Sequence, residues 1–406
     1  MSEHYDVIVI GAGLVGATLA AKLALGDAGR QWRIAVIEAG GPPQRFEHHE
    51  FDSRVAALSP ASQKLLQSID CWANLEAERV CPYRAMEVWD GEGTGQIEFH
   101  AEDLHSDILG HIVENSVTVR AVRRRLAELD VTVIQPARVE TLLKPEQAGQ
   151  PVRLTLDDRR RLSANLVVAA DGAQSRVREL AGFATREWSY RQRAIVTTVR
   201  TEEPHNYTAR QRFMRTGPLA LLPLRRRTET GWDAHYCSIV WSADTALAEE
   251  LMTLDEHVFC ERLGRDFEHR LGVITDTAQR LAIPLHQRHA RQYIQPGIAL
   301  VGDAAHSIHP LAGQGLNLGL CDVQVLAEEL ERGVRRGLSS GDYSIVRRYQ
   351  RSRLGDNLAM MGAMEGFKRL FGNSNPPLTW LRNTGMSGIN QMPLAKNAIA
   401  RRAMGF

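Results

Sequence analysis

The chain has 406 residues, of which 44% are hydrophobic, and its formal net charge is +1. A chain of this length can bury a large core and predicts two or three domains. The balanced charge gives no electrostatic reason to expect a nucleic-acid partner. The five cysteines are scattered without a CxxC pair, which is typical of a reducing compartment. No signal-peptide pattern or apolar run of about 18 residues is present, so we expect a cytoplasmic protein, at most peripheral to a membrane.

The first motif is a glycine-rich turn between an apolar strand and a helix. The segment YDVIVIGAGLVGATLAAKLAL predicts a strand over 5–10, then Gly11, Gly13 and Gly16, then a helix. Such glycines permit a tight turn, let backbone amides approach a pyrophosphate and let the helix pack on the strand, while the helix N-terminus favours the anion. A second strand ends at Glu38, whose carboxylate could accept hydrogen bonds from a ribose diol. Together these features indicate a dinucleotide site.

Two later strands also end in a glycine beside an acid, at Asp171-Gly172 and at Gly302-Asp303. Between them, residues 186–279 read as short β-strands followed by a helix near 254–271, and GEGTG at 91–95 forms the turn of a separate hairpin. The sequence therefore predicts an α/β fold: a Rossmann-like nucleotide-binding domain with an inserted β-sheet substrate domain and C-terminal helices. The expected division is 1–75, 104–185 and 280–340 for nucleotide binding, 76–103 and 186–279 for substrate, and 341–406 for the C-terminal helices.

The segment GDAAHSIHPLAGQGLNLG at 302–319 allows several interpretations. Asp303, His306 and His309 could ligate a metal, but no fourth ligand is evident, so no metal is expected. A catalytic histidine lacks its nucleophile, because no GxSxG occurs in the chain. We therefore expect His306 to satisfy backbone carbonyls in a turn.

A flat ligand suits this segment better. Asp303 ends a strand and can reach a sugar-like hydroxyl at the carboxyl edge of the sheet. Pro310 fixes the backbone, while Gly313 and Gly315 allow close approach to a planar ring. A helix over about 316–331 then begins at that ring, and its dipole would stabilise an anionic heterocycle such as a reduced flavin. The segment is predicted to be a flavin seat.

These motifs carry a family resemblance. The chain resembles the FAD-dependent aromatic hydroxylases of the p-hydroxybenzoate hydroxylase type over nearly its whole length, in GAGLVG (11–16), SRVAALS (53–59), AADGAQSRVR (169–178) and GDAAHSIHPLAGQGLNLG (302–319). Within that superfamily it is most similar to the ubiquinone-biosynthesis hydroxylases, particularly the octaprenylphenol hydroxylase branch. The closer resemblance lies in MEVWDGEGTGQI, LGHIVENSV, VRTEEPH and CSIVWS.

The resemblance implies which residues contact FAD. Besides the glycines and Glu38, it implies contacts of Arg54 near the phosphates and of Asn115 at the flavin. It also implies that the backbone of Val139 contacts the adenine and that Asp171 lies near both the cofactor and the nicotinamide donor. Asp171 could equally be an ordinary turn aspartate. Gly302 and Asp303 are expected at the ribityl chain, and Gly313, Gln314, Gly315, Leu316 and Asn317 at the isoalloxazine.

The resemblance also implies an activity. FAD would be reduced by NAD(P)H or another donor and would react with O2 to give a C4a-hydroperoxide, which hydroxylates a polyprenylated phenol. No side chain is required as a catalytic nucleophile. A flavin dehydrogenase or reductase, a hydroxylase of another ring carbon or another aromatic substrate, and a non-catalytic flavin-containing assembly protein are the alternatives. GPLALLPL and SIVW supply either substrate-facing surface or plain core.

The segment after Glu365 carries basic and apolar residues but no acid. One interpretation is a helix pair that packs on its own domain or on a second subunit. The other is a basic amphipathic surface that meets anionic lipid or other ubiquinone-biosynthesis proteins.

Overall fold

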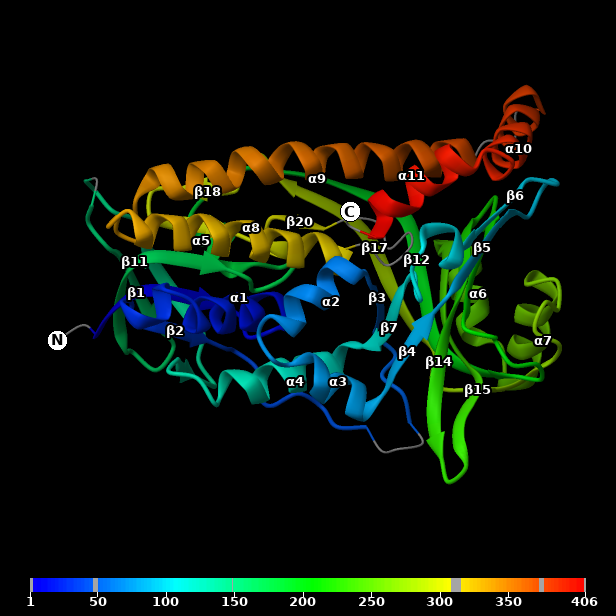
Figure 1. Cartoon of the computed structure of the whole chain (residues 1–406), viewed down its shortest axis with the longest axis horizontal. Coiled ribbons are helices and arrows are strands. Elements are labelled where there is room, and N and C mark those ends of the chain that lie inside the picture. The colour runs from blue at the N-terminus through cyan, green and yellow to red at the C-terminus, as the bar shows by residue number, and fades with distance from the viewer. Residues whose placement is uncertain (1–2, 47–49, 148, 308–314, 372–375, 405–406) are drawn as a thin grey trace.

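The structure is a computed structural model and describes residues 3–46, 50–147, 149–307, 315–371 and 376–404. These residues form three β-sheets with helices packed around them (Figure 1). The mixed α/β character agrees with the predicted fold class.

The first sheet has eight strands and a parallel centre. Its order is β18 (Ile294–Gln295), β19 (Ile298–Leu300), β11 (Arg161–Ala169), β1 (Glu3–Ile10), β2 (Ile34–Ile37) and β8 (Thr132–Ile134), with β10 (Val152–Leu156) and β9 (Val139–Leu143) joined through β11. The central strands are apolar runs buried on both faces, as parallel strands between helices must be. Helices cover them: α1 (Leu14–Leu25), α4 (Asn115–Leu126), α5 (Arg176–Leu180) and α8 (Gly315–Arg335).

The register of this sheet brings the ends of four strands to one level. Ile10 pairs with Ala169 on one side and with Ile37 on the other, and Ala169 pairs with Leu300. All four strands run parallel, so the glycine and acid residues that follow them emerge at the same edge. The sequence motifs predict that the dinucleotide binds at this edge.

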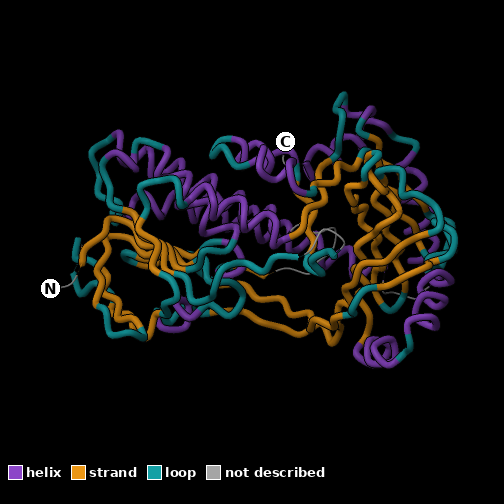
Figure 2. Tube along the Cα trace, turned by 90° about the horizontal axis from the view of Figure 1, so that it is seen from below, coloured by secondary structure: helices purple, strands orange, loops and turns teal. Residues whose placement is uncertain are grey.

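The second sheet has nine strands. Its order is β20 (His306–Ser307), β17 (Leu281–Ala290), β12 (Thr185–Thr201), β15 (Gly231–Asp244), β14 (Gly217–Thr228), β13 (Thr208–Met214), β5 (Ala85–Asp90) and β6 (Gln96–His100), with β16 (Ile274–Thr277) paired to β12. Helices α6 (Thr245–Thr253) and α7 (Glu256–Asp266) pack on one face through a core that includes Ile195, Ile239 and Trp241. Long strands connect the two halves of the molecule (Figure 2).

A third, three-stranded sheet joins the other two. Its order is β3 (Val55–Leu58), β7 (Gly110–Glu114) and β4 (Val80–Tyr83), all antiparallel. It lies beside α2 (Pro60–Gln67) and α3 (Trp72–Glu78), and short 3-10 turns occupy η1 (Ala28–Arg30), η2 (Glu102–Leu104) and η3 (Gly302–Ala304).

Strand pairing crosses the boundaries of the predicted division at two places. Strands β17 and β20 lie within 280–340 but pair in the nine-stranded sheet. Strand β4 lies within 76–103 but pairs with β7, in the three-stranded sheet. The reason is that β-strand character can be read locally, whereas the partner of a strand is fixed by long-range hydrogen bonds. The expected hairpin with glycines in its turn corresponds to β5 and β6.

The C-terminal helices are α9 (Tyr343–Phe371), α10 (Pro376–Asn390) and α11 (Pro393–Met404). Helix α9 runs along both halves of the molecule (Figure 1). Met386 and Ile389 of α10 pack on β5 and β6, and Ala400 and Met404 of α11 pack beside η2. At these residues the helices pack on their own chain. Within the described ranges, none of the helices has both the length and the apolar character needed to cross a bilayer.

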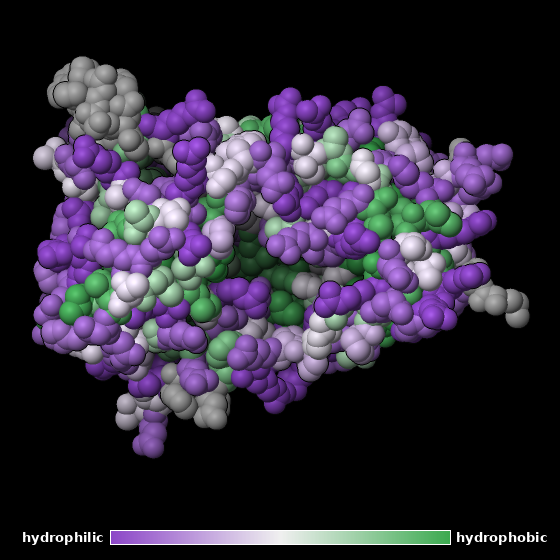
Figure 3. Space-filling view, turned by 180° about the vertical axis from the view of Figure 1, so that it is seen from behind, coloured by the Kyte–Doolittle hydropathy of each residue, from purple (hydrophilic) through white to green (hydrophobic). Residues whose placement is uncertain are grey.

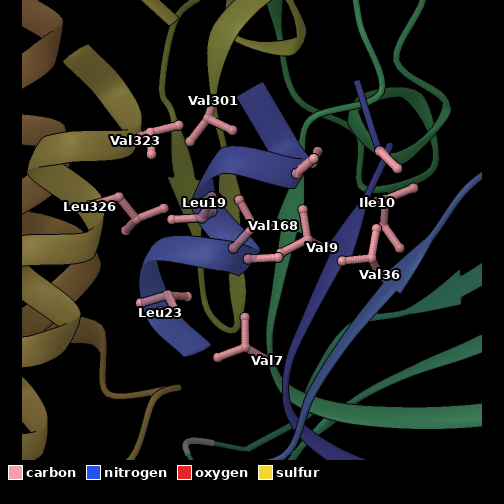
Figure 4. Packing of buried hydrophobic residues seen from close by; sticks show 14 of the residues in the cluster. Val7, Val9, Ile10, Leu19, Leu23, Val36, Val168, Val301, Val323 and Leu326 are labelled. Carbon is pink, nitrogen blue, oxygen red and sulfur yellow. The ribbon is translucent and has the colours of Figure 1, made fainter. Parts of the chain in front are cut away.

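One face of the molecule is hollowed near its middle, and hydrophobic side chains line the hollow (Figure 3). The largest core lies elsewhere, between α1, α8 and the parallel strands. There Val9 and Val168 of the sheet meet Leu19 of α1 and Val323 of α8 (Figure 4). The parallel sheet is therefore held firmly, and its carboxyl edge has a rigid support.

We predict that stability falls in acid partly because of His205. This side chain is fully buried: Nε2 contacts the Leu224 carbonyl at 2.7 Å, and Nδ1 accepts from the Tyr207 amide at 3.0 Å. Burial lowers the pKa of His205 to about 4, below the ordinary value near 6.5. The unfolded chain therefore binds the proton first, and up to about 3 kcal/mol of stability is lost as pH falls from 7 to 4.

Urea unfolding between pH 7 and pH 4 measures this loss. The variant His205→Gln should show a shallower decrease than the wild type, whereas His257→Gln, at a side chain that is 82% exposed, should follow the wild type. A His205→Gln curve parallel to the wild-type curve would show that the loss comes from other groups.

Candidate functional site

The glycine turn after β1 is shaped by very close packing. A Cβ at Gly11, where φ is +101°, would lie 2.5 Å from the Ala170 carbonyl oxygen, and one at Gly16 would lie 2.0 Å from the Gly11 carbonyl oxygen. Neither position can hold a side chain. Gly13 differs, because a Cβ there would meet no described atom within 4 Å. It is the N-cap of α1 and provides no side-chain cap, so the helix N-terminus faces open space.

Glu38 lies directly after β2 and beside this turn. Its carboxylate accepts from the Ala12 amide at 2.6 Å and the Gly40 amide at 2.7 Å, and it pairs with Arg123 at 3.1 Å. Arg123 also donates to the Ala12 carbonyl at 2.7 Å and the Gly41 carbonyl at 3.1 Å. The Glu38 side chain is 15% exposed, so the carboxylate is fixed in orientation yet still reaches the surface.

A cleft of about 290 Å³ opens at this point. It is lined by Gly13, Glu38, Pro43, Gln44, Phe46, Asp52, Arg54, Asn115, Ser116, Val119 and Arg123. Four of the predicted contacts, Gly13, Glu38, Arg54 and Asn115, thus meet in one cavity, although they come from distant parts of the sequence.

Arg54 is carried by a loop that a buried acidic pair holds in place. Asp52 accepts from the amides of Arg54 at 2.9 Å and Ser116 at 2.8 Å. The Asp52 amide donates to Glu114 at 2.7 Å, and Glu114 pairs with Arg79 at 3.0 Å. Burial raises the pKa of Glu114 to about 7, and Arg79 opposes that rise. Arg54 itself is exposed, so its guanidinium is available to a phosphate.

Asp171 lies at the same edge, after β11. Its Oδ2 accepts from the Val177 amide at 3.2 Å, and its Oδ1 is buried with no hydrogen-bond partner in the described part of the chain. Burial raises the pKa of this carboxyl. Nearby, the buried Arg178 donates to the Ala304 carbonyl at 2.9 Å and the Ala173 carbonyl at 2.8 Å. Arg178 therefore ties the turn after β11 to the turn after β19.

The turn after β19 presents Asp303. Gly302 has φ +58° and packs on Val15 of α1, as does Gly319 of α8. The Asp303 side chain is exposed, whereas Ala304 and Ala305 beside it are buried. Helix α1, helix α8 and this turn thus meet around Val15, with Asp303 directed away from the core.

The first turn of α8 contains three of the residues predicted at the isoalloxazine, Gly315, Leu316 and Asn317. Gly315 and Leu316 are partly exposed. The Asn317 side chain bonds to protein: Oδ1 accepts from the Ser59 amide at 2.9 Å and Ser62 Oγ at 2.7 Å, and Nδ2 donates to the Ala57 carbonyl at 2.8 Å. These bonds anchor α8 to β3 and α2 through the Asn317 side chain. The contact of this residue with the isoalloxazine stays a prediction. Pro310, Gly313 and Gln314 lie outside the described residues.

Val139 and His306 both lie in buried surroundings. Val139 is buried in the large core at the start of β9 and is not a lining residue of the cleft. His306 does not bond a backbone carbonyl as expected, because its Nε2 contacts the Asp322 carboxylate at 2.5 Å. In the ranges that the structure covers, no group of three or more His, Cys, Asp or Glu residues is arranged to hold a metal ion.

The sequence reasoning missed Arg123, Asp52, Ser116 and Arg178. Arg123 is one of four arginines in the α4 sequence NSVTVRAVRRRL, so nothing local distinguishes it from a solvated residue. Its contact with Ala12 spans 111 positions. Arg178 is the last residue of the motif AADGAQSRVR, yet its contact with Ala304 spans 126 positions and could not be predicted from the neighbouring sequence.

The site fits a flavin adenine dinucleotide. The N-terminus of α1 and the guanidinium groups of Arg54 and Arg123 suit a pyrophosphate, and the Glu38 carboxylate suits a ribose diol. The open space at Gly13 is what close approach of an anion requires.

Comparison with known proteins agrees with this chemistry. The family described as FAD binding domain matches residues 4–355. The 3-demethoxyubiquinol 3-hydroxylase of Escherichia coli (strain K12) is 35% identical over 406 residues, covering 100% of both chains. The ubiquinone hydroxylase UbiL of Rhodospirillum rubrum is 36% identical, covering 98% of this chain and 89% of its own. The crystal structure of p-nitrophenol 4-monooxygenase PnpA from Pseudomonas putida DLL-E4 superposes with a TM-score of 0.77 at 19% identity, covering 100% and 99% of the two chains.

The fold, the site and these relatives define an FAD-dependent monooxygenase of the p-hydroxybenzoate hydroxylase type. More narrowly, the chain belongs to the family of ubiquinone-biosynthesis hydroxylases.

We predict that Gly13→Asp abolishes FAD binding without unfolding the protein. A Cβ at this position meets no described atom within 4 Å, so the sheet should be undisturbed. Its carboxylate would face the pyrophosphate at close range. Apoprotein titrated with FAD should show no fluorescence quenching. Gly362→Asp, also in open space but on α9, is the control and should bind FAD normally. Normal affinity of Gly13→Asp for FAD would show that the pyrophosphate does not bind at Gly13.

We predict that Glu38→Gln weakens FAD binding about tenfold, the scale of one hydrogen bond to a charged group. A carboxylate only accepts, whereas glutamine brings an NH2 group against Ala12, Gly40 or Arg123. Isothermal titration of the apoprotein measures the change. Glu202→Gln is the control. Glu202 also accepts from a backbone amide, that of Val273, but it does not line the cleft, so the affinity for FAD should be unchanged. Equal effects of the two variants would indicate a general loss of stability.

Proposed function

We propose that the protein hydroxylates the aromatic ring of a polyprenylated phenol in ubiquinone biosynthesis. One oxygen atom of O2 enters the ring and the other leaves as water, with two electrons supplied by NAD(P)H or another donor. Bound FAD supplies the oxygen activation. The chain binds and orients the phenol and excludes water from it. The named substrate of the Escherichia coli relative, 3-demethoxyubiquinol, supports a ring of this type.

The observation that carries this proposal is an apolar cluster where the three-stranded and nine-stranded sheets meet. Buried Ala57, Cys81, Ile112 and Leu224 form its base. Around them lie partly exposed side chains, namely Phe51, Val55, Tyr83, Tyr207, Leu222 and Tyr236. Such a surface suits an aromatic ring and a hydrocarbon chain, and the hollow in Figure 3 offers a hydrophobic surface of this kind.

The apolar cluster also lies beside the proposed flavin seat. The Ala57 carbonyl, on β3, accepts from Asn317 in the first turn of α8. We therefore assign FAD binding to the parallel sheet, with Gly11, Gly302 and Asp303 at its edge. The nine-stranded sheet supplies the substrate surface through β14 and β15.

Contact with a lipid surface would bring a prenyl tail to this cluster, and we include it in the proposal. Met392 and Ile399 of the C-terminal region are 59% and 46% exposed, and Arg401 is exposed. Lys396, one of the basic residues after Glu365, contributes little to this attraction, because it pairs with Asp103 at 2.9 Å and is 12% exposed. Attraction between the remaining basic groups and anionic lipid would weaken in salt.

Turnover with isotopically labelled oxygen tests the proposal. Purified FAD-loaded protein, NAD(P)H and a polyprenylphenol carried in anionic vesicles are supplied with 18O2, and the product is examined by mass spectrometry. Hydroxylation predicts one 18O atom in the ring, and fragmentation locates it. Substrate oxidation without 18O indicates a dehydrogenase, and no turnover with any donor supports an assembly protein. If lipid contact matters, 0.5 M salt slows turnover on vesicles but not in detergent.

A variant of the apolar cluster completes this test. Leu222→Asp places a charge among Tyr236, Tyr207 and Leu224, so we expect at least a tenfold loss of hydroxylated product while FAD stays bound. Leu143→Asp, at a side chain that is 62% exposed on β9, makes the same change far from the cluster and should retain activity. Unchanged hydroxylation by Leu222→Asp would show that the aromatic ring of the substrate does not bind at this cluster.

A further inference from the structure

Behind the proposed flavin seat lies a completely buried carboxylate, Asp322 of α8. Its Oδ2 accepts from the Gly302 amide at 3.0 Å and contacts His306 Nε2 at 2.5 Å. Its Oδ1 accepts from Arg353 Nε at 2.8 Å and Asn357 Nδ2 at 3.3 Å. Each oxygen therefore has two partners, and the carboxylate is saturated.

The charge state of this group follows from its partners. Burial alone would raise the pKa of Asp322, but His306 and Arg353 hold it below its ordinary value. An ionised carboxylate can only accept, so His306 must donate from Nε2. His306 Nδ1 is then left buried without a hydrogen-bond partner in the described ranges. Among the described residues, the hydrogen bond that orients the imidazole is the one to this carboxylate, and the Tyr293 ring lies beside it with ring centroids 5.7 Å apart.

These bonds join segments that form the cofactor edge. Gly302 is the turn residue immediately before Asp303, and His306 lies in β20, which leaves that turn. Arg353 and Asn357 belong to α9, where Arg353 also donates to Asn357 Oδ1 at 2.7 Å. Asp322 is therefore the point at which α8 and α9 hold the turn that presents Asp303.

A buried charge of this kind is costly unless every bond is made, and the loss of one partner leaves another unpaired. The neighbouring Val323 and Leu326 of the same helix pack in the apolar core. The carboxylate of Asp322 adds to this packing a directional bond that fixes the position of the Gly302–Asp303 turn.

We propose that Asp322, held by Arg353, is a positioning residue for FAD: it fixes the Gly302–Asp303 turn so that Asp303 meets the ribityl chain. This inference rests on the proposed function, in which Gly302 and Asp303 lie at the FAD-binding edge, and on the sequence-based prediction that Asp303 meets the ribityl chain. Asp322 does not touch the cofactor, and it acts through the backbone of Gly302 and the ring of His306.

The test measures FAD affinity per folded molecule in apoprotein, together with the visible spectrum of the bound flavin. Asp322→Asn keeps the shape but turns an acceptor into a donor facing Gly302, His306 or Arg353. We expect the Kd for FAD to rise at least tenfold and the flavin absorption bands to shift. Glu331→Gln is the matched control, because Glu331 lies on the same helix and also accepts from two backbone amides, those of Asp27 at 2.9 Å and Ala28 at 3.2 Å. Its Kd should match the wild type.

Arg353 provides the second variant, which decides the question if Asp322→Asn does not fold. Arg353→Lys keeps the positive charge beside Asp322, whereas Arg353→Met removes it. Affinity should fall in the order wild type, Lys, Met, with the Met variant at least tenfold weaker. A folded Asp322→Asn or Arg353→Met protein with a Kd within twofold of wild type and an unshifted spectrum overturns the proposal.

Asp303→Ala separates this inference from the placement on which it rests. If Asp303→Ala weakens FAD binding but the Asp322 and Arg353 variants do not, the placement holds and the positioning role is wrong. If Asp303→Ala leaves affinity unchanged as well, the ribityl chain lies elsewhere and both ideas fail.

Discussion

The approach of α1 to the end of β1 is the constraint on which the site depends. Gly16 leaves no room for even a Cβ against the Gly11 carbonyl, so helix and strand are as close as backbones allow. That closeness points the helix N-terminus at the sheet edge, where Glu38 holds the turn through Ala12. Any side chain at Gly16 would push α1 outward and separate the amides from the acid. A cradle for a dinucleotide thus follows from packing before any ligand is considered.

A second anchor of a different kind holds the far side of the same edge. Val15 of α1 lies between Gly302 and Gly319, so apolar packing brings α8 to the turn after β19. Apolar contact is non-directional and would tolerate small rotations of that turn. Arg178 adds direction by bonding the carbonyls of Ala173 and Ala304. The turns after β11 and β19 consequently move together.

Much of this edge could be predicted from the sequence, because its signals are local. A strand, its glycine and its acid are adjacent, and strands that run parallel end at one edge, as the register of Ile10, Ala169 and Leu300 shows. The supporting contacts could not be predicted, since they join residues far apart in the sequence: 64 positions separate Asp52 from Ser116, and 111 separate Ala12 from Arg123. Asn317 gives a further example: it lies in the motif that predicted a flavin contact, and the bond from its side chain to the Ala57 carbonyl, 260 positions away, could not be predicted from that motif.

Strands β17 and β20 pair in the nine-stranded sheet, although they lie in a segment predicted to bind the nucleotide. This pairing is informative because it concerns how the substrate surface and the flavin seat are coupled. The segment that carries Gly302 and Asp303 at the parallel sheet continues directly into β20, where His306 pairs with His289 of β17 in the other sheet. The Ala290 amide reinforces this junction by donating to the Ala305 carbonyl at 2.8 Å. Strand β17 in turn pairs along β12, the 17-residue strand that runs beside β15. The proposed substrate surface and the proposed flavin seat therefore share one stretch of hydrogen-bonded backbone, and a shift of either sheet would have to move the other.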